Sequence, residues 1–255
     1  MLTNISLFSG AGGLDLGAKL VGGFRTVAYV EYDRYAQGVL MSRMRSGDLD
    51  DAPIFEDVRT FDGRSLAGGI DVVSGGFPCQ DLSVAGKRKG INGGGRSGLW
   101  KEFARILGEV GPRCVLLENV PAITLDGNLG VVLGDLASMG FDAQWFCIPA
   151  GTFGAHFVGN RFFACGWKVN SATSSGGWER VRAAQTGAWS EQQFKGLLQS
   201  IGRVDAPSRT GKRISDGVAH SSHRLRLCGN GVVPQQATAA WKMIRNMAEK
   251  PAGEG

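Results

Sequence analysis

Short apolar runs alternate with amphipathic stretches through most of the chain. The apolar runs, which favour buried strands, occupy residues 4–8, 26–31, 54–58, 70–74, 114–118, 144–148 and 162–166. Between them, residues 14–20, 33–44, 99–110 and 129–139 have helical spacing, and Asp33 is placed to cap the second helix. Strands that alternate with helices predict an α/β fold with a doubly wound, mostly parallel sheet.

This alternation stops at Trp167. Residues 170–177 are rich in serine and glycine, as linkers are. A capping-box spacing and a helical period over residues 190–201 predict one short amphipathic helix. A last helix is predicted from about Pro234, with Trp241 on its apolar face.

Composition restricts the class of protein. The chain has 255 residues, 43% of them hydrophobic, which is enough for one large domain and a small insertion. Its five cysteines form no CxxC pair, which argues against a zinc site or a disulfide framework and favours a reducing cytoplasm. No apolar run reaches the roughly 18 residues of a membrane span. The first strand begins so early that we expect no signal peptide.

The charge balance favours an acidic partner. The formal net charge is +5 and the sequence pI is about 9.1, which suits nucleic acid. Residues 203–226 hold six basic side chains against two acidic ones. Such a stretch is either a solvated loop or a surface that meets phosphates.

Residues 75–80, Gly-Gly-Phe-Pro-Cys-Gln, are the most informative stretch of the chain. They follow an apolar strand, and the end of a strand is where α/β enzymes place their chemistry. Pro78 restricts the backbone just before Cys79. A cysteine alone is more often a small core residue, so it is the neighbours that make Cys79 a candidate nucleophile.

A glycine-rich loop over residues 9–13 lies between the first strand and the first helix. Its spacing differs from the GxGxxG dinucleotide pattern, but N–H groups at a helix start can still contact a ligand. Glu31 ends the second strand, where a carboxylate can accept hydrogen bonds from both ribose hydroxyls of an adenosine. Together with Asp57 at the end of the third strand, this loop predicts a nucleotide-type site. A tight turn with exposed carboxylates is the alternative.

Glu118 ends the apolar strand 114–118. Partial burial there would raise the pKa of its carboxyl group, which could then hydrogen-bond a ring nitrogen of a base. A carboxylate that caps the next helix is the alternative. If the fourth and fifth strands are neighbours, Cys79 and Glu118 share one cleft.

Taken together and in order, these segments resemble the cytosine-5 DNA methyltransferase family of the bacterial and phage type. Residues 8–14 resemble its S-adenosylmethionine loop, 77–80 its catalytic loop, 118–120 its base-binding motif and 229–234 its C-terminal motif. The fold implied is the Rossmann-like fold of S-adenosylmethionine-dependent methyltransferases. The cofactor contacts implied are Phe8, Gly10, Gly12, Gly13, Leu14, Glu31, Tyr32, Asp57, Val58, Pro78, Leu99, Asn230 and Val232.

The resemblance also implies a reaction on duplex DNA. Cys79, Glu118 and Arg161 would be catalytic, and a flipped cytosine would receive a methyl group at carbon-5. S-adenosylmethionine would be the cofactor, S-adenosylhomocysteine its product, and no metal would be needed. The DNA contacts implied are Gln80, Ser83, Lys87, Arg88, Lys89, Arg209, Lys212 and Arg213.

The resemblance divides the chain into three parts. Residues 1–166 would form the catalytic and cofactor-binding domain, 167–222 a small inserted target-recognition region, and 223–255 a segment that returns to the catalytic domain. We expect a cytoplasmic monomer, from a bacterial host or encoded by a phage, with double-stranded DNA and no membrane as partner. A cognate restriction endonuclease encoded elsewhere is consistent with this picture.

Two departures and three alternatives remain. The family has a pair of arginines before residues 162–166, whereas this chain has Arg161 with Gly159 at the partner position. The target-recognition region is short for the family. A cytosine-5 RNA methyltransferase acting on tRNA is the first alternative. A nonenzymatic DNA-binding relative would lack Cys79 or Glu118, and a nicotinamide-dependent dehydrogenase would need another glycine spacing.

Overall fold

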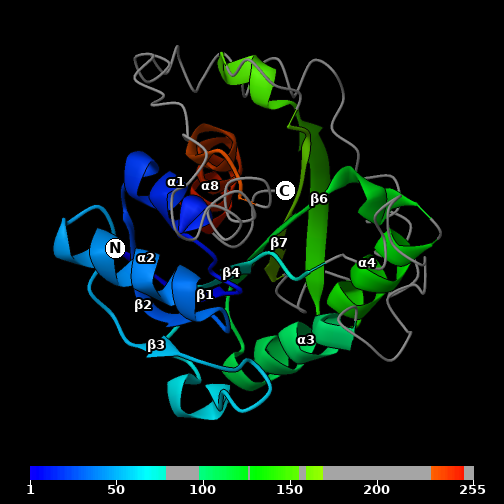
Figure 1. The fold of residues 1–255 in the computed structure, drawn as a ribbon. Coiled ribbons are helices and arrows are strands. Elements are labelled where there is room, and N and C mark those ends of the chain that lie inside the picture. Colours follow the sequence, from blue (N-terminus) through cyan, green and yellow to red (C-terminus); the bar gives the residue numbers. More distant parts are fainter. Residues whose placement is uncertain (79–97, 126, 155–158, 169–230, 250–255) are drawn as a thin grey trace.

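The computed structural model describes residues 1–78, 98–125, 127–154, 159–168 and 231–249. These residues form a seven-stranded sheet in the order β3-β2-β1-β4-β5-β7-β6, with helices on both faces (Figure 1). The strands are β1 (Leu2–Leu7), β2 (Phe24–Val30), β3 (Ile54–Phe55), β4 (Val72–Gly75), β5 (Cys114–Asn119), β6 (Phe141–Ile148) and β7 (Arg161–Lys168).

The sheet is mostly parallel, which confirms the predicted fold class. Strands β3, β2, β1, β4 and β5 pair in parallel, and β7 runs antiparallel to both β5 and β6. Each predicted strand is present, but β3 ends at Phe55 and the prediction that it reaches Val58 is wrong. The N–H groups of Thr60 and Phe61 bond to the carbonyl of Asp57, which turns the chain away from the sheet.

The helices predicted within the described residues are also present. They are α1 (Gly13–Val21), α2 (Arg34–Arg45), α3 (Leu99–Val110), α4 (Asn128–Ser138) and α8 (Pro234–Glu249). The predicted cap of α2 is confirmed, since the Asp33 side chain accepts hydrogen bonds from the N–H groups of Tyr35 and Ala36. Short 3-10 turns occur at Gly63–Leu66, Pro121–Thr124 and Ala150–Phe153.

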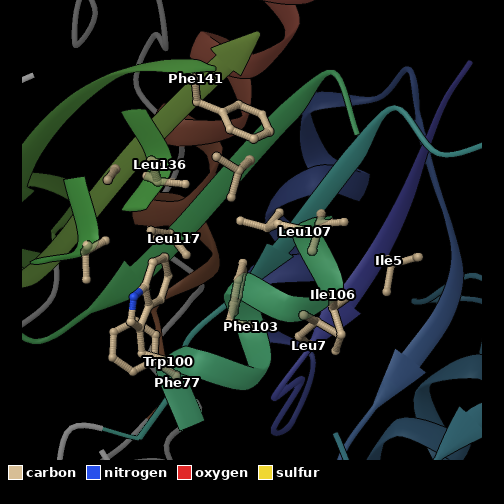
Figure 2. Packing of buried hydrophobic residues seen from close by; sticks show 14 of the residues in the cluster. Ile5, Leu7, Phe77, Trp100, Phe103, Ile106, Leu107, Leu117, Leu136 and Phe141 are labelled. Carbon is tan, nitrogen blue, oxygen red and sulfur yellow. The ribbon is translucent and has the colours of Figure 1, made fainter. Parts of the chain in front are cut away.

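Two hydrophobic layers cover the two faces of the sheet. On one face α3 and α4 pack on alternate residues of the strands, and Figure 2 shows Trp100 and Phe103 of α3 in this layer. On the other face α1 and α8 lie side by side (Figure 1). Because every second strand residue faces the same layer, most of the sheet is buried on both sides.

Helix α8 is fastened to the first helix of the chain. The indole N–H of Trp241 donates a 2.8 Å hydrogen bond to the Leu14 carbonyl, and the Trp241 ring packs against Phe24. The predicted helix at 190–201 and the boundaries at 167 and 222 lie outside the described residues. The domain division therefore stays a prediction. Among the described helices, none has the length and apolar character that a membrane crossing requires.

Candidate active site

The predicted chemistry gathers at one edge of the sheet. Strands β1, β2, β4 and β5 are parallel neighbours, so their carboxyl ends lie together. Phe8 follows β1, Glu31 follows β2, Gly76 follows β4 and Glu118 lies near the end of β5. Loops at the carboxyl ends of parallel strands are the usual place for ligands in such sheets.

The loop after β1 holds Glu31. The N–H of Gly10 donates to one carboxylate oxygen and the N–H of Asp33 to the other, both at 2.7 Å. Burial raises the pKa of Glu31, and the two N–H groups oppose that rise. Phe8 has a φ of 53°, the single positive value among described residues other than glycine. Such a backbone is strained, as it often is at functional sites.

The C-terminal segment returns to this loop. A side chain at Gly13 would place its Cβ 2.7 Å from the carbonyl oxygen of Val232, so only glycine permits this contact. Gly13 and Val232, both predicted cofactor contacts, therefore lie against each other. The Leu14 side chain is 7% exposed and packs in the layer under α8. Its contribution to a ligand site would come from its backbone.

The predicted adenine side of the site is more open. Tyr32 is 72% exposed, and the Arg59 guanidinium lies 5.9 Å from the centre of its ring. Arg59 also binds the Asp57 carboxylate at 2.7 Å, and these hydrogen bonds hold the pKa of Asp57 below its usual range. The Val58 side chain is buried in the core, and its carbonyl accepts a 2.7 Å hydrogen bond from Arg105.

Glu118 and Arg161 form an ion pair at the end of β5. Arg161 Nε lies 3.1 Å from Glu118 Oε1, and the two side chains are 12% and 15% exposed. Burial raises the pKa of Glu118 to about 7, although the positive charge of Arg161 opposes the rise. Arg161 also donates a 3.0 Å hydrogen bond to the carbonyl of Gly231. A carboxyl with this pKa can exchange a proton near neutral pH.

Glu118 also lies against the segment that leads to Cys79. A Cβ at Gly76 would be 2.5 Å from Glu118 Oε2, so glycine is needed for this approach. Sequence reasoning missed Asn119, whose amide donates a 3.2 Å hydrogen bond to the Phe77 carbonyl. Pro78 is half-buried just beyond. Asn119 lies inside the base-binding motif of residues 118–120, and this position is the signal in the sequence that points to it.

Leu99, another predicted cofactor contact, is the first residue of α3. It packs at the margin of the α3–α4 layer. The neighbouring Trp100 contacts the Phe77 ring with centroids 5.4 Å apart. The start of α3 is thereby fixed against the segment that precedes Cys79.

The remaining predicted site residues lie outside the described part of the chain, and their roles stay predictions. They are Cys79, Gln80, Ser83, Lys87, Arg88, Lys89, Arg209, Lys212, Arg213 and Asn230. The described cysteines are Cys114, Cys147 and Cys165. Burial raises the pKa of each, to about 11 for Cys114. Thiols of this kind are poor nucleophiles.

The residues present fit a nucleoside-bearing cofactor. Glu31 is fixed by two backbone donors and keeps lone pairs for hydroxyl groups. Tyr32 presents an exposed ring beside it. Within the described ranges, no group of three or more histidine, cysteine or acidic side chains is arranged to hold a metal ion.

The strand order and the site define the Rossmann-like methyltransferase class. The chain belongs to the C-5 cytosine-specific DNA methylase family, whose model matches residues 2–224. It is 34% identical over 160 residues to the type II methyltransferase M.CviJI of Paramecium bursaria Chlorella virus IL3A, covering 62% of this chain and 41% of that protein.

Other relatives agree with this assignment. The DNA (cytosine-5-)-methyltransferase M.ApeKI of Aeropyrum pernix is 37% identical over 158 residues, covering 54% of this chain and 33% of that protein. This chain thus spans less than half the length of these two curated relatives. The solved structure of the Entamoeba histolytica methyltransferase EhMeth shares the fold, with a TM-score of 0.68 and 12% identity over 98% of this chain and 99% of that one.

Proposed function

We propose that the protein transfers a methyl group from S-adenosylmethionine to carbon-5 of cytosine in duplex DNA. The observation that carries the proposal is the largely buried Glu118 with a pKa of about 7, paired with Arg161 beside the segment that leads to Cys79. Family membership supports the same reaction. Carbon-5 of cytosine is a poor nucleophile, so the site must first activate the ring.

Cys79 and Glu118 would activate the ring together. The Cys79 thiolate adds to carbon-6, and the electron pair of the 5,6 double bond moves toward carbon-5 and the ring. Protonated Glu118 donates to ring nitrogen 3 and stabilises the charge that develops there. Arg161, whose Nε lies 3.1 Å from Glu118 Oε1, would hold the Glu118 carboxyl in place and would lie near the base oxygen or the DNA backbone. Once carbon-5 is methylated, water removes its proton and the bond between carbon-6 and sulfur breaks.

The cofactor side of the site would be built on the β1 loop. S-adenosylmethionine supplies a methyl group that is activated by the positive sulfur. Glu31 would accept hydrogen bonds from the ribose hydroxyls, and Tyr32 would lie against the adenine. Asp57 and Val58 would meet the adenine edge, and Val232 would close the pocket over Gly13. Excluding water at these contacts strengthens each of them.

DNA recognition would involve the segments that the structure does not describe. The target cytosine must leave the duplex, at a cost of roughly a few kcal/mol. Lys87, Arg88 and Lys89 would meet phosphates beside the flipped base, with Gln80 and Ser83. Residues 167–222 would select the target sequence, with Arg209, Lys212 and Arg213 on the backbone. The cytoplasmic location, the monomeric state and a partner endonuclease stay predictions.

The test uses DNA in which 5-fluorocytosine replaces every cytosine, so the recognition sequence need not be known. Fluorine cannot leave as a cation, so the reaction stalls after methyl transfer and Cys79 stays bonded to carbon-6. Denaturing gels should show a shifted band for the wild type with S-adenosylmethionine. The band should be absent for Cys79→Ala and weak when the cofactor is omitted.

Two further reactions test whether the substrate is DNA or RNA, and whether the methyl group goes to carbon-5 or to an amino nitrogen. Methyl transfer to tRNA but not to duplex DNA would replace the proposed substrate. Turnover on ordinary DNA without a trapped adduct on the fluorinated DNA would contradict attack at carbon-5. Cys79→Ala should still bind S-adenosylhomocysteine, because Cys79 is not among the proposed cofactor contacts.

A further inference from the structure

Gln236 is a buried polar side chain at the start of α8. It is 1% exposed. Its amide nitrogen donates hydrogen bonds of 2.7 Å to the carbonyls of Ile148 and Gly159. Its amide oxygen accepts a 3.3 Å hydrogen bond from the Val233 N–H. A buried amide with both ends satisfied fixes the segments that it joins, because losing one partner leaves a buried group unpaired.

The amide nitrogen of Gln236 holds the segment that leads into β7. Ile148 is the last residue of β6, and Gly159 stands two positions before Arg161. The Ala150 N–H donates to the same Gly159 carbonyl at 3.2 Å. Gln236 therefore helps to fix where the chain enters β7, and with it the backbone position from which the Arg161 side chain extends.

The amide oxygen of Gln236 holds the segment that precedes α8. Val233 follows Val232, which lies against Gly13 of the proposed cofactor loop. Gly231, one residue earlier, accepts a 3.0 Å hydrogen bond from Arg161. Arg161 in turn contacts Glu118 at 3.1 Å. A continuous set of contacts thus runs from the cofactor loop through Gly231 and Arg161 to Glu118. Gln236 forms hydrogen bonds to the chain on both sides of the contact between Arg161 and Gly231.

We propose that Gln236 is a positioning residue that couples the cofactor pocket to the Glu118 site by holding Arg161 on Gly231. The proposal rests on the function proposed above. Because these contacts are continuous, a change that frees Arg161 should weaken cofactor binding as well as slow the activation of cytosine. Gln236 is not needed to hold α8 in place, since Trp241 and the apolar face of α8 attach the helix to α1.

The experiment compares Gln236→Met with Gln235→Met in the full chain. Methionine keeps the length of glutamine and removes its hydrogen bonds. Gln235 is the adjacent, half-buried glutamine of the same helix, so it controls for the loss of an amide at this position. Calorimetry measures the dissociation constant of S-adenosylhomocysteine, and the fluorinated DNA measures the rate of adduct formation. We expect Gln236→Met to weaken S-adenosylhomocysteine about tenfold and to slow trapping, with Gln235→Met like the wild type.

A double-mutant cycle with Arg161→Met separates coupling from a merely structural effect. If Gln236 acts through Arg161, Gln236→Met has little further effect on S-adenosylhomocysteine binding once Arg161 is replaced. The same tenfold loss in both backgrounds would overturn the proposal. Far-UV circular dichroism checks folding, and Gln236→Asn takes the place of Gln236→Met in the cycle if the latter does not fold.

The outcomes distinguish this proposal from the function on which it rests. A wild type that neither binds S-adenosylhomocysteine nor forms an adduct overturns both. A wild type that does both, together with additive effects in the cycle, overturns only the role of Gln236. Loss of binding in Gln235→Met equal to that in Gln236→Met also overturns it, because the buried hydrogen bonds would then be irrelevant.

Discussion

Glu31 and Glu118 are two carboxylates at the same edge of the sheet, and they are held in different ways. Burial raises the pKa of both. The rise at Glu31 is opposed by two backbone N–H groups at 2.7 Å, whereas at Glu118 it is opposed by the side chain of Arg161. The first carboxylate is fixed by main-chain N–H groups of two loops, and the second by a side chain of the neighbouring strand β7.

This difference suits two different tasks. Backbone donors cannot rotate away, so Glu31 is an acceptor of fixed position, as a ligand hydroxyl requires. The proton on Glu118 depends on one guanidinium, which also bonds to Gly231. A group with a pKa near 7 is suited to proton donation. The comparison predicts that changes at Glu118 affect turnover and changes at Glu31 affect cofactor binding.

The largest effect is expected for Glu118→Gln. An amide can still donate a hydrogen bond to ring nitrogen 3 but cannot supply a proton, so kcat should fall by about 10²–10³, the usual loss when a group that stabilises developing charge is removed. S-adenosylhomocysteine binding should stay within about twofold of the wild type. Radiolabelled methyl transfer and calorimetry measure the two quantities.

The pH profile sharpens this prediction. Because the active form of Glu118 is protonated, wild-type turnover should decline as pH rises through about 7, and Glu118→Gln should lack that decline. Glu102→Gln, on the half-exposed surface of α3, is the control. An unchanged kcat in Glu118→Gln would remove Glu118 from the reaction.

Glu31→Ala should come next in size. The loss of a charge-assisted hydrogen bond to the ribose should weaken S-adenosylmethionine binding by roughly 1.5–3 kcal/mol. The turnover number at saturating cofactor should change much less. Glu56→Ala is the control, because this nearby carboxylate is 66% exposed and lies 3.6 Å from Arg34. Equal affinities of Glu31→Ala and the wild type would place the ribose elsewhere.

Asp57→Ala tests the open side of the pocket with a close internal control. Asp57 binds Arg59 and Asp62 binds Arg64 in the same way, by a backbone N–H and a bidentate guanidinium two residues later. Both pairs are on the surface. Asp57→Ala should weaken S-adenosylhomocysteine about three- to tenfold, as one lost hydrogen bond does. Asp62→Ala should leave binding unchanged, and equal effects would assign both pairs to local structure.

The helices and strands could be predicted well because apolar spacing and terminating residues lie within each element or next to it. Helix α3 has the predicted bounds, since its apolar face is regular and Gly111 ends it in a left-handed conformation. The alignment of Glu31 with the glycine loop also followed from the strand–turn–helix pattern. The strand β3 was overestimated because the Asp57 carbonyl accepts hydrogen bonds from the N–H groups of Thr60 and Phe61, a turn that the apolar run does not signal.

The rest of the site depends on long-range order that no local pattern contains. Arg161 reaches Glu118 because β7 inserts between β5 and β6 in the antiparallel sense. The alternation of strands and helices does not reveal that insertion. Gln236 reads as an ordinary residue of a helix start, and its role appears only when Ile148 and Gly159 are brought to it.

A third buried carboxylate, Asp15, extends the comparison away from the site. It belongs to α1 and is 3% exposed, and its carboxylate accepts hydrogen bonds from the hydroxyls of Ser6 on β1 and Thr26 on β2 at 2.9 and 3.2 Å. Burial raises its pKa to about 6, more than these hydroxyls can offset. Asp15 therefore costs stability when it is ionised.

The smallest effect expected is a pH-dependent gain of stability in Asp15→Asn. The folded pKa of about 6 exceeds the reference value of 3.8, so the folded state binds the proton more tightly and wild-type stability falls as pH rises from about 4 through 6. Asparagine cannot ionise, and it keeps an acceptor for one hydroxyl. At pH 8, urea unfolding should show Asp15→Asn more stable by on the order of 1 kcal/mol. At pH 4.5 the difference should nearly vanish, and the exposed Asp51→Asn should show none at either pH. A loss of stability at pH 8 would mean that the hydrogen bonds from Ser6 and Thr26 outweigh the cost of burying the charge.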